Sequence, residues 1–140
     1  MTFEVLDISG DIGIRASGKS CEEAFVNAGI AMYSLITDIS KIKDEKHLSI
    51  EVKADSPESL LVRYLNELIF QFDTYGFIGR RIELNSFSLQ PPAHLKAKVH
   101  GEDFDPDRHE RRLLVKAATY HDIRIESRNS ECVTEVIFDI

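Results

Sequence analysis

The sequence lacks the motifs and segments that are typical of several common classes of protein. It contains two cysteines, Cys21 and Cys132, and no C-x-x-C pair of the kind that binds zinc or carries redox chemistry. No apolar run approaches the ~20 residues needed to cross a bilayer, and the first residues lack the basic and apolar regions of a secretory signal. We therefore expect a cytoplasmic protein without a membrane segment, whose cysteines fit a reducing compartment.

Motifs of the common catalytic and metal sites do not stand out either. There is no H-E-x-x-H zinc motif and no G-x-S-x-G nucleophile elbow, and we do not interpret the glycines before Lys19 as a phosphate-binding loop. Asp103, Asp105 and Asp107 have the spacing that opens a calcium-binding EF-hand, but Arg108 stands where that loop requires glycine. We therefore expect this segment to be a solvated loop or a surface for a partner.

The charge balance bears on the kind of partner. Acidic residues outnumber basic ones by 24 to 17, which gives a net charge of −7. An acidic surface is repelled by phosphate backbones, and nucleic-acid-binding proteins usually carry a basic stripe. We therefore expect no direct, tight binding of RNA or DNA, whereas protein partners, metal ions and small ligands stay open.

Two segments have the periodicity of helices. The first follows a capping box formed by Ser20 and Glu23, and its apolar stripe contains Gly29, which we interpret as a point of close packing. Ser56 followed by Pro57 is typical of the start of the second helix. Because each segment has one apolar face, both helices are expected to pack against a sheet.

The rest of the chain has the alternation of strands. Strands are expected over residues 3–8, 12–17, 47–54, 80–90, 94–101 and 132–140, with one or two more between 113 and 127. This order predicts an α+β fold, with two helices packed against a mostly antiparallel sheet of about seven to eight strands. We expect one domain over residues 1–140, a common domain size.

Three charged residues have no settled role from the residues alone. Lys116 lies in an apolar stretch, where a lysine either points to solvent or is held by a partner charge. Asp11 follows a turn between the first two expected strands, and Asp139 precedes Ile140 at the end of the last. If these segments meet, the converging carboxylates need a divalent cation such as calcium, or the Lys116 ammonium. Otherwise the two aspartates lie apart in water.

Five segments together resemble the archease family, in order from about residue 3 to residue 140. They are FEVLDISGDIGIRASGKSCEEAFVNAGIAMYSLITD, LLVRYLNELIFQFDTYGF, GEDFDPDRHE, VKAATYHDI and the final VIFDI. The resemblance implies a cytosolic, non-catalytic cofactor of an RtcB-type RNA ligase, which joins RNA halves in tRNA splicing and RNA repair using GTP. It further implies that the protein promotes guanylylation of the ligase and broadens the nucleotides that the ligase accepts.

The resemblance also implies a set of functional residues. The positions essential for activation would be Asp11, Lys116 and Asp139, and a calcium ion, or another divalent cation, would be bound by Asp11, Asp139 and Ile140. The chain departs from the family pattern at Ile8, where the family has histidine, and in the residues that precede Lys116.

Two other functions use the same features. The carboxylates suit a metal-dependent enzyme that acts on a small nucleotide or phosphoester, which would turn over its substrate without a partner. A general chaperone or modulator of other proteins would need an exposed apolar patch, whereas the apolar stripes of both helices are better explained as core.

Overall fold

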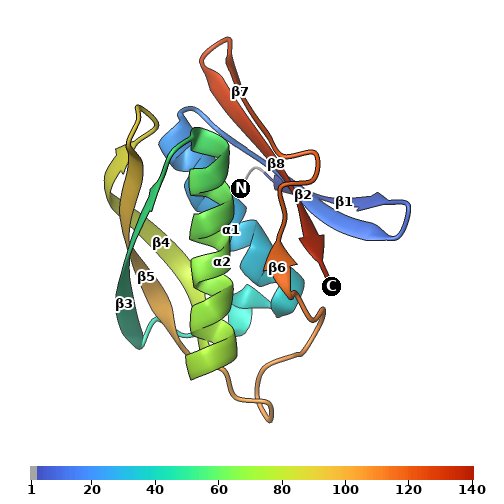
Figure 1. The fold of residues 1–140 in the computed structure, drawn as a ribbon. Coiled ribbons are helices and arrows are strands. Elements are labelled where there is room, and N and C mark those ends of the chain that lie inside the picture. Colours follow the sequence, from blue (N-terminus) through green and yellow to red (C-terminus); the bar gives the residue numbers. More distant parts are fainter. Residues whose placement is uncertain (1–2) are drawn as a thin grey trace.

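The computed structural model describes residues 3–140, which form two helices, one short 3-10 helix and eight strands (Figure 1). The elements are β1 (Phe3–Ile8), β2 (Asp11–Gly18), α1 (Cys21–Ile36), η1 (Ile39–Lys41), β3 (Lys46–Ala54), α2 (Pro57–Tyr75), β4 (Phe77–Ser88), β5 (Ala93–Asp103), β6 (Ala117–Ala118), β7 (Arg124–Arg128) and β8 (Glu131–Asp139). Every strand pair is antiparallel. The predicted α+β class is therefore confirmed.

The strands divide into two sheets. One has the order β1-β2-β8-β6, with β7 also paired to β8, and the other has the order β3-β5-β4. Helix α1 contacts β2, β4 and β8, and α2 contacts β3 and β6, so both helices bridge the two sheets (Figure 1). Neither helix in the described part of the chain is both long and apolar enough to span a membrane.

Both helices begin as local chemistry predicts, and α2 also ends as predicted. The side-chain oxygens of Ser20 and Ser56 each accept a backbone N–H from three residues further on, at 3.1 Å, which caps α1 and α2. Pro57 occupies the start of α2, where its missing N–H costs nothing. Gly76 ends α2 in a left-handed conformation, with a φ angle of 72°.

Gly29 lies where two elements approach closely, as predicted. A Cβ atom at this position would collide with the hydroxyl of Tyr64 on α2 and would lie 2.6 Å from a methyl carbon of Ile82 on β4. The hydroxyl of Tyr64 donates to the carbonyl of Phe25, at 2.9 Å. The missing side chain at Gly29 therefore lets α1 pack against both neighbours.

The two cysteines are joined in a disulfide, whereas we expected them to fit a reducing compartment. A disulfide links Cys21, at the first turn of α1, to Cys132, at the start of β8. The β2–β8 register sets Gly18 opposite Cys132, and the chain reaches Cys21 three residues later. The pairing follows from the contact between β2 and β8, which spacing along the chain does not reveal.

The acidic segment after β5 is a loop, but it is not simply solvated. The side chain of Glu102 is 3% exposed, and it accepts hydrogen bonds from Arg108 and from the backbone N–H of Lys43, at 2.6 Å. The fully buried His109 lies with its Nε2 atom 3.1 Å from Glu102, while its Nδ1 accepts the N–H of Asp105 at 2.8 Å. His109 is therefore a tether of the loop, with Nε2 as the donor.

The surroundings of Glu102 stabilise the ionised form of its carboxyl group. The bidentate Arg108, the N–H of Lys43 and His109 together lower the pKa of Glu102 from 4.5 to about 2, against the opposing effect of burial. The ionised form is thus the one that holds the loop. Most of the segment, including Asp103 and Asp107, is exposed as expected for a solvated loop, whereas His109 is buried against Glu102 of the preceding strand.

Candidate functional site

Asp11 and Asp139 lie at matching ends of adjacent strands. Asp11 is the first residue of β2 and Asp139 is the last of β8. The register pairs Ile12 with Phe138, so one further step sets Asp11 opposite Asp139. Directly opposed residues of an antiparallel pair share a face of the sheet. The sequence left open whether these two segments meet or lie apart. The strand register supports the first possibility, that they meet.

The β1–β2 turn positions Asp11. Ser9 and Gly10 both have positive φ angles, of 50° and 89°, and form a two-residue turn of the kind that matches strand twist. Ile8 therefore pairs directly with Asp11, and Ala117 of β6 pairs with Asp139. These residues define what we call the acidic row, which runs Ile8, Asp11, Asp139, Ala117 across four strands.

Ile8 places an apolar side chain in the acidic row. It is 47% exposed. A cavity of about 440 Å³ opens beside it, on the β1, β8 and β7 side. Its lining is mostly apolar and consists of Leu6, Ile8, Asp122, Ile123, Arg124, Glu135, Val136 and Ile137. Ile8 therefore connects the carboxylates to an apolar surface.

Lys116 joins the row through its backbone. Its N–H donates to the carbonyl of Asp139 at 2.8 Å, immediately before β6 begins. The side chain is exposed. Among residues 3–140, no ion pair within 4.0 Å involves Asp11, Lys116 or Asp139. The three predicted residues thus share one corner of the sheet while their charges stay available.

Asn66 on α2 holds β6 in place, and sequence reasoning missed it. Its side-chain amide donates to the carbonyl of Ala118 at 3.2 Å, and its carbonyl oxygen accepts the N–H of the same residue at 2.7 Å. A two-residue strand has few bonds of its own, so this clamp fixes the segment that carries Lys116. An asparagine inside a helix is a weak signal for such a role, because it is also common on exposed faces.

The acidic row contains the oxygen ligands that a hard cation prefers, but it contains too few of them to complete a site. Carboxylate oxygens suit calcium, which takes six to eight oxygen ligands. Across the described residues, no three side chains of His, Cys, Asp or Glu come close enough to hold a metal ion. With Ile8 in place of a polar residue, Asp11 and Asp139 fit a site that draws its other ligands from water, from the carboxylate of Ile140 or from a partner.

One sequence motif is excluded by its structural setting. Residues 13–20 do have the spacing G-x-x-x-x-G-K-S of a P-loop, and the interpretation that this spacing is missing was wrong. Gly13 to Gly18 pair with β8 as part of β2, and their backbone therefore cannot wrap a phosphate. The oxygen of Ser20 caps α1, and Glu22 and Glu23 already place negative charge in its first turn.

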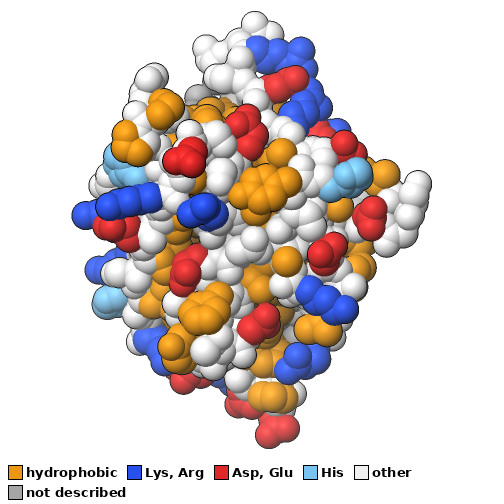
Figure 2. Space-filling model, in the orientation of Figure 1, with side chains coloured by type: hydrophobic (Ala, Val, Ile, Leu, Met, Phe, Trp, Pro, Cys, Tyr) orange, Lys and Arg blue, Asp and Glu red, His pale blue; other side chains and the backbone are white. Residues whose placement is uncertain are grey.

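The surface shows no broad apolar area on the face in view. Figure 2 shows apolar side chains there in small groups, separated by acidic and basic ones. The large apolar side chains that are exposed in the described chain are Val5, Ile8, Phe70, Tyr75, Leu114, Tyr120 and Ile140. Only Ile8 and Ile140 adjoin the two aspartates of the acidic row in sequence or register.

Comparisons with known proteins identify the family of this chain. Residues 3–140 match the model of the Archease protein family (MTH1598/TM1083). The chain is 37% identical to the protein archease of Sulfolobus acidocaldarius, over 99% of this chain and 98% of that protein. It is 39% identical to the protein archease of Pyrococcus abyssi, over 89% and 87% of the two chains.

Solved structures share the fold. The solution structure of protein 1598 of Methanobacterium thermoautotrophicum superposes with a TM-score of 0.82 at 31% identity, covering 99% of this chain and 98% of that one. A crystal structure from Thermotoga maritima, described as "an archease, possible chaperone", has a TM-score of 0.66 at 21% identity, covering 96% and 94%. The chain belongs to the archease family.

Proposed function

We propose that this protein is a non-catalytic cofactor of an RtcB-type, GTP-dependent RNA ligase. It would promote guanylylation of the ligase and broaden the nucleotides that the ligase accepts, in tRNA splicing and RNA repair. Membership of the archease family supports this assignment. The structural observation that carries it is the meeting of Asp11, Asp139 and the backbone of Lys116 at one corner of the sheet.

The charges of this corner suit a partner's active site better than a self-contained one. Asp11, Lys116 and Asp139 are all exposed, and no nucleophile with an adjacent base accompanies them in the acidic row. Exposed carboxylates can hold a divalent cation whose coordination a partner completes, and an exposed ammonium can contact a nucleotide phosphate. Calcium, bound by Asp11, Asp139 and Ile140, would supply positive charge at the interface.

The test is labelling of the purified ligase with radioactive GTP. We expect wild-type protein to accelerate labelling, and Asp11→Asn or Asp139→Asn to remove most of the acceleration, because each change deletes a charge while keeping the shape. Asp73→Asn is the matched control, since Asp73 is exposed on α2 and belongs neither to the acidic row nor to the acidic loop. Equal acceleration by Asp139→Asn and Asp73→Asn would refute the proposal.

Two further readouts separate the alternatives. Titration with calcium chloride in a calorimeter should show binding that Asp139→Asn weakens. Turnover of a nucleotide by this protein alone would favour the metal-dependent enzyme instead. Suppression of aggregation of unrelated proteins, with no effect on the ligase, would favour the chaperone role given in the description of the Thermotoga protein.

A further inference from the structure

Strand β3 has a free edge. Among residues 3–140 it pairs only with β5, and it lies at one end of the three-stranded sheet. Residues of an edge strand alternate between those bonded to the neighbour and those whose N–H and C=O groups point outward. The carbonyl of Lys53 accepts a hydrogen bond from Arg63 of α2, at 3.4 Å, so Lys53 points outward. By the same alternation, the N–H and C=O groups of Ser49 and Glu51 also point away from β5.

The two edges of this sheet differ in how they are protected. Strand β4, at the opposite edge, has irregularities between Gly79 and Arg81 and between Leu84 and Ser86. Bulges of this kind discourage strand addition. Strand β3 runs through nine paired residues without a register shift and contains no proline. Its edge is therefore regular enough to accept another strand.

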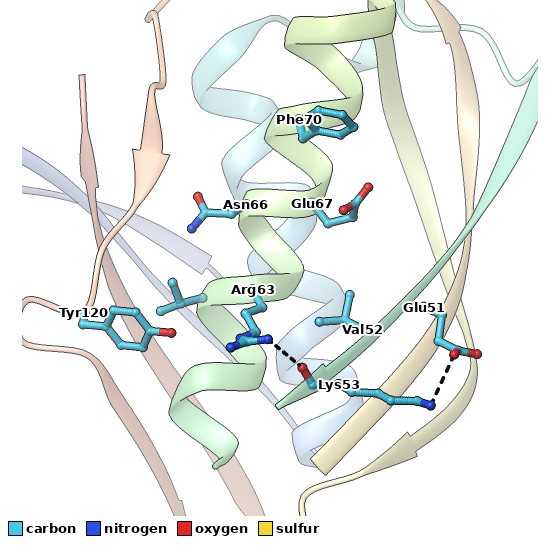
Figure 3. A pocket seen from close by; sticks show the side chains of 9 residues that line it. Glu51, Val52, Lys53, Arg63, Asn66, Glu67, Phe70 and Tyr120 are labelled. Atoms are coloured by element: carbon cyan, nitrogen blue, oxygen red, sulfur yellow. Dashed lines mark hydrogen bonds and ion pairs between the residues drawn. The ribbon is translucent and has the colours of Figure 1, made fainter. Parts of the chain in front are cut away.

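A groove lies along this edge, between β3 and α2 (Figure 3). Its volume is about 510 Å³. The buried side chains of Val52 and Val62 contribute to its lining, and Phe70, which is 49% exposed, also lines it. Figure 3 shows Arg63 reaching from α2 to Lys53. The groove thus places apolar side chains next to unpaired backbone.

The charged side chains of the groove largely satisfy one another. Glu51 lies 3.8 Å from the ammonium of Lys53 and 3.3 Å from that of Lys96. Glu67 accepts a hydrogen bond from Gln71 at 2.8 Å. The groups left for a ligand are therefore the outward N–H and C=O groups of Ser49 and Glu51 and the N–H of Lys53, since the carbonyl of Lys53 already accepts from Arg63. An extended peptide backbone presents alternating N–H and C=O groups that match those of a strand edge. The expected occupant of the groove is therefore an extended peptide segment.

We propose that the groove between β3 and α2 binds an extended segment of a partner protein, which adds as a fourth strand at the β3 edge. Its backbone pairs with Ser49, Glu51 and Lys53, and its alternate side chains are apolar where they face Val62 and Phe70. A second copy of this chain is a poorer fit, because antiparallel pairing of two β3 strands would bring a second α2 to the same side of the joined sheet. Neither Lys116 nor any residue of the acidic row lines this groove, so peptide binding here can be tested independently of ligase activation.

The experiment uses a phage-displayed library of random dodecapeptides selected on the full-length protein. The decisive variant is Glu51→Pro, which deletes an outward N–H but no bond to β5, and which edge strands tolerate. Glu51→Ala removes the same side chain and keeps the N–H, so it is the matched control. Selected peptides should bind wild type and Glu51→Ala alike, and should bind Glu51→Pro at least about fivefold more weakly, from the lost hydrogen bond and the blocking ring.

Amide hydrogen exchange tests the premise directly. In the free protein the amides of Ser49, Glu51 and Lys53 should exchange faster than those of Ile50 and Val52, and a bound peptide should slow the first group. The proposal is overturned if no peptide is enriched, or if Glu51→Pro binds as well as Glu51→Ala does. It is also overturned if the outward amides are already protected by dimer formation, measured by light scattering.

Discussion

Protonation of Glu102 should destabilise the protein in acid by a predictable amount. The carboxylate is almost fully buried and is held by Arg108, by His109 and by the N–H of Lys43. These contacts lower its pKa from 4.5 to about 2. At about 1.4 kcal/mol for each unit of pKa, the difference between these two values corresponds to roughly 3 to 4 kcal/mol of folding free energy.

The sign follows from the direction of the shift. Because the folded-state pKa is the lower one, the unfolded chain binds the proton more tightly. The contribution of Glu102 is therefore fully present above about pH 5 and is lost progressively as the pH falls towards 2. In the variant Glu102→Gln this pH dependence disappears, and at neutral pH the variant is less stable by roughly 3 to 4 kcal/mol, because Arg108 loses its buried partner.

The assay is urea unfolding of wild type and Glu102→Gln at closely spaced pH values between 3 and 7. The two stability curves should converge as the pH falls. Glu110→Gln is the control, since the ion pair of Glu110 with Arg112 is exposed and should contribute less than about 1 kcal/mol. Parallel curves for wild type and Glu102→Gln would refute the assignment of Glu102 as the ionised anchor of the loop.

Three other predictions concern the core and its covalent link, and all are checked by urea unfolding. Reduction of the Cys21–Cys132 disulfide, which spans a sequence separation of 111, should cost about 5 kcal/mol of stability from loop entropy, and the double variant with alanine at both positions should not respond to reductant. The hydroxyl of Tyr33 is buried without a partner among the described residues, so Tyr33→Phe should be neutral or stabilising, whereas Tyr64→Phe should cost about 1 kcal/mol because it loses a hydrogen bond. Gly29→Ala should gain about 1 kcal/mol of helix propensity but lose roughly 1–3 kcal/mol to the clash with Tyr64, and a net gain in stability would contradict the packing described.

Sequence patterns predicted the helices of this protein well because caps act locally. Ser20 and Ser56 bond to N–H groups three residues away, and Gly76 ends α2 through its own φ angle. The P-loop spacing from Gly13 onward, by contrast, does not form a phosphate-binding loop, since these residues pair with β8 as a strand. Local chemistry predicts a helix or strand, but the tertiary partner of that element decides whether a sequence motif within it can function.

The amino-acid sequence by itself determined the class of fold, the element boundaries to within a few residues, and the archease resemblance that selected Asp11, Lys116 and Asp139. The tertiary structure alone decided which segments meet. It paired Cys21 with Cys132, clamped β6 with Asn66 and divided the strands into two sheets. The physical reason is range: propensity and periodicity act over a few residues, whereas these contacts join positions 52 and 111 residues apart, through strand registers that no single segment encodes.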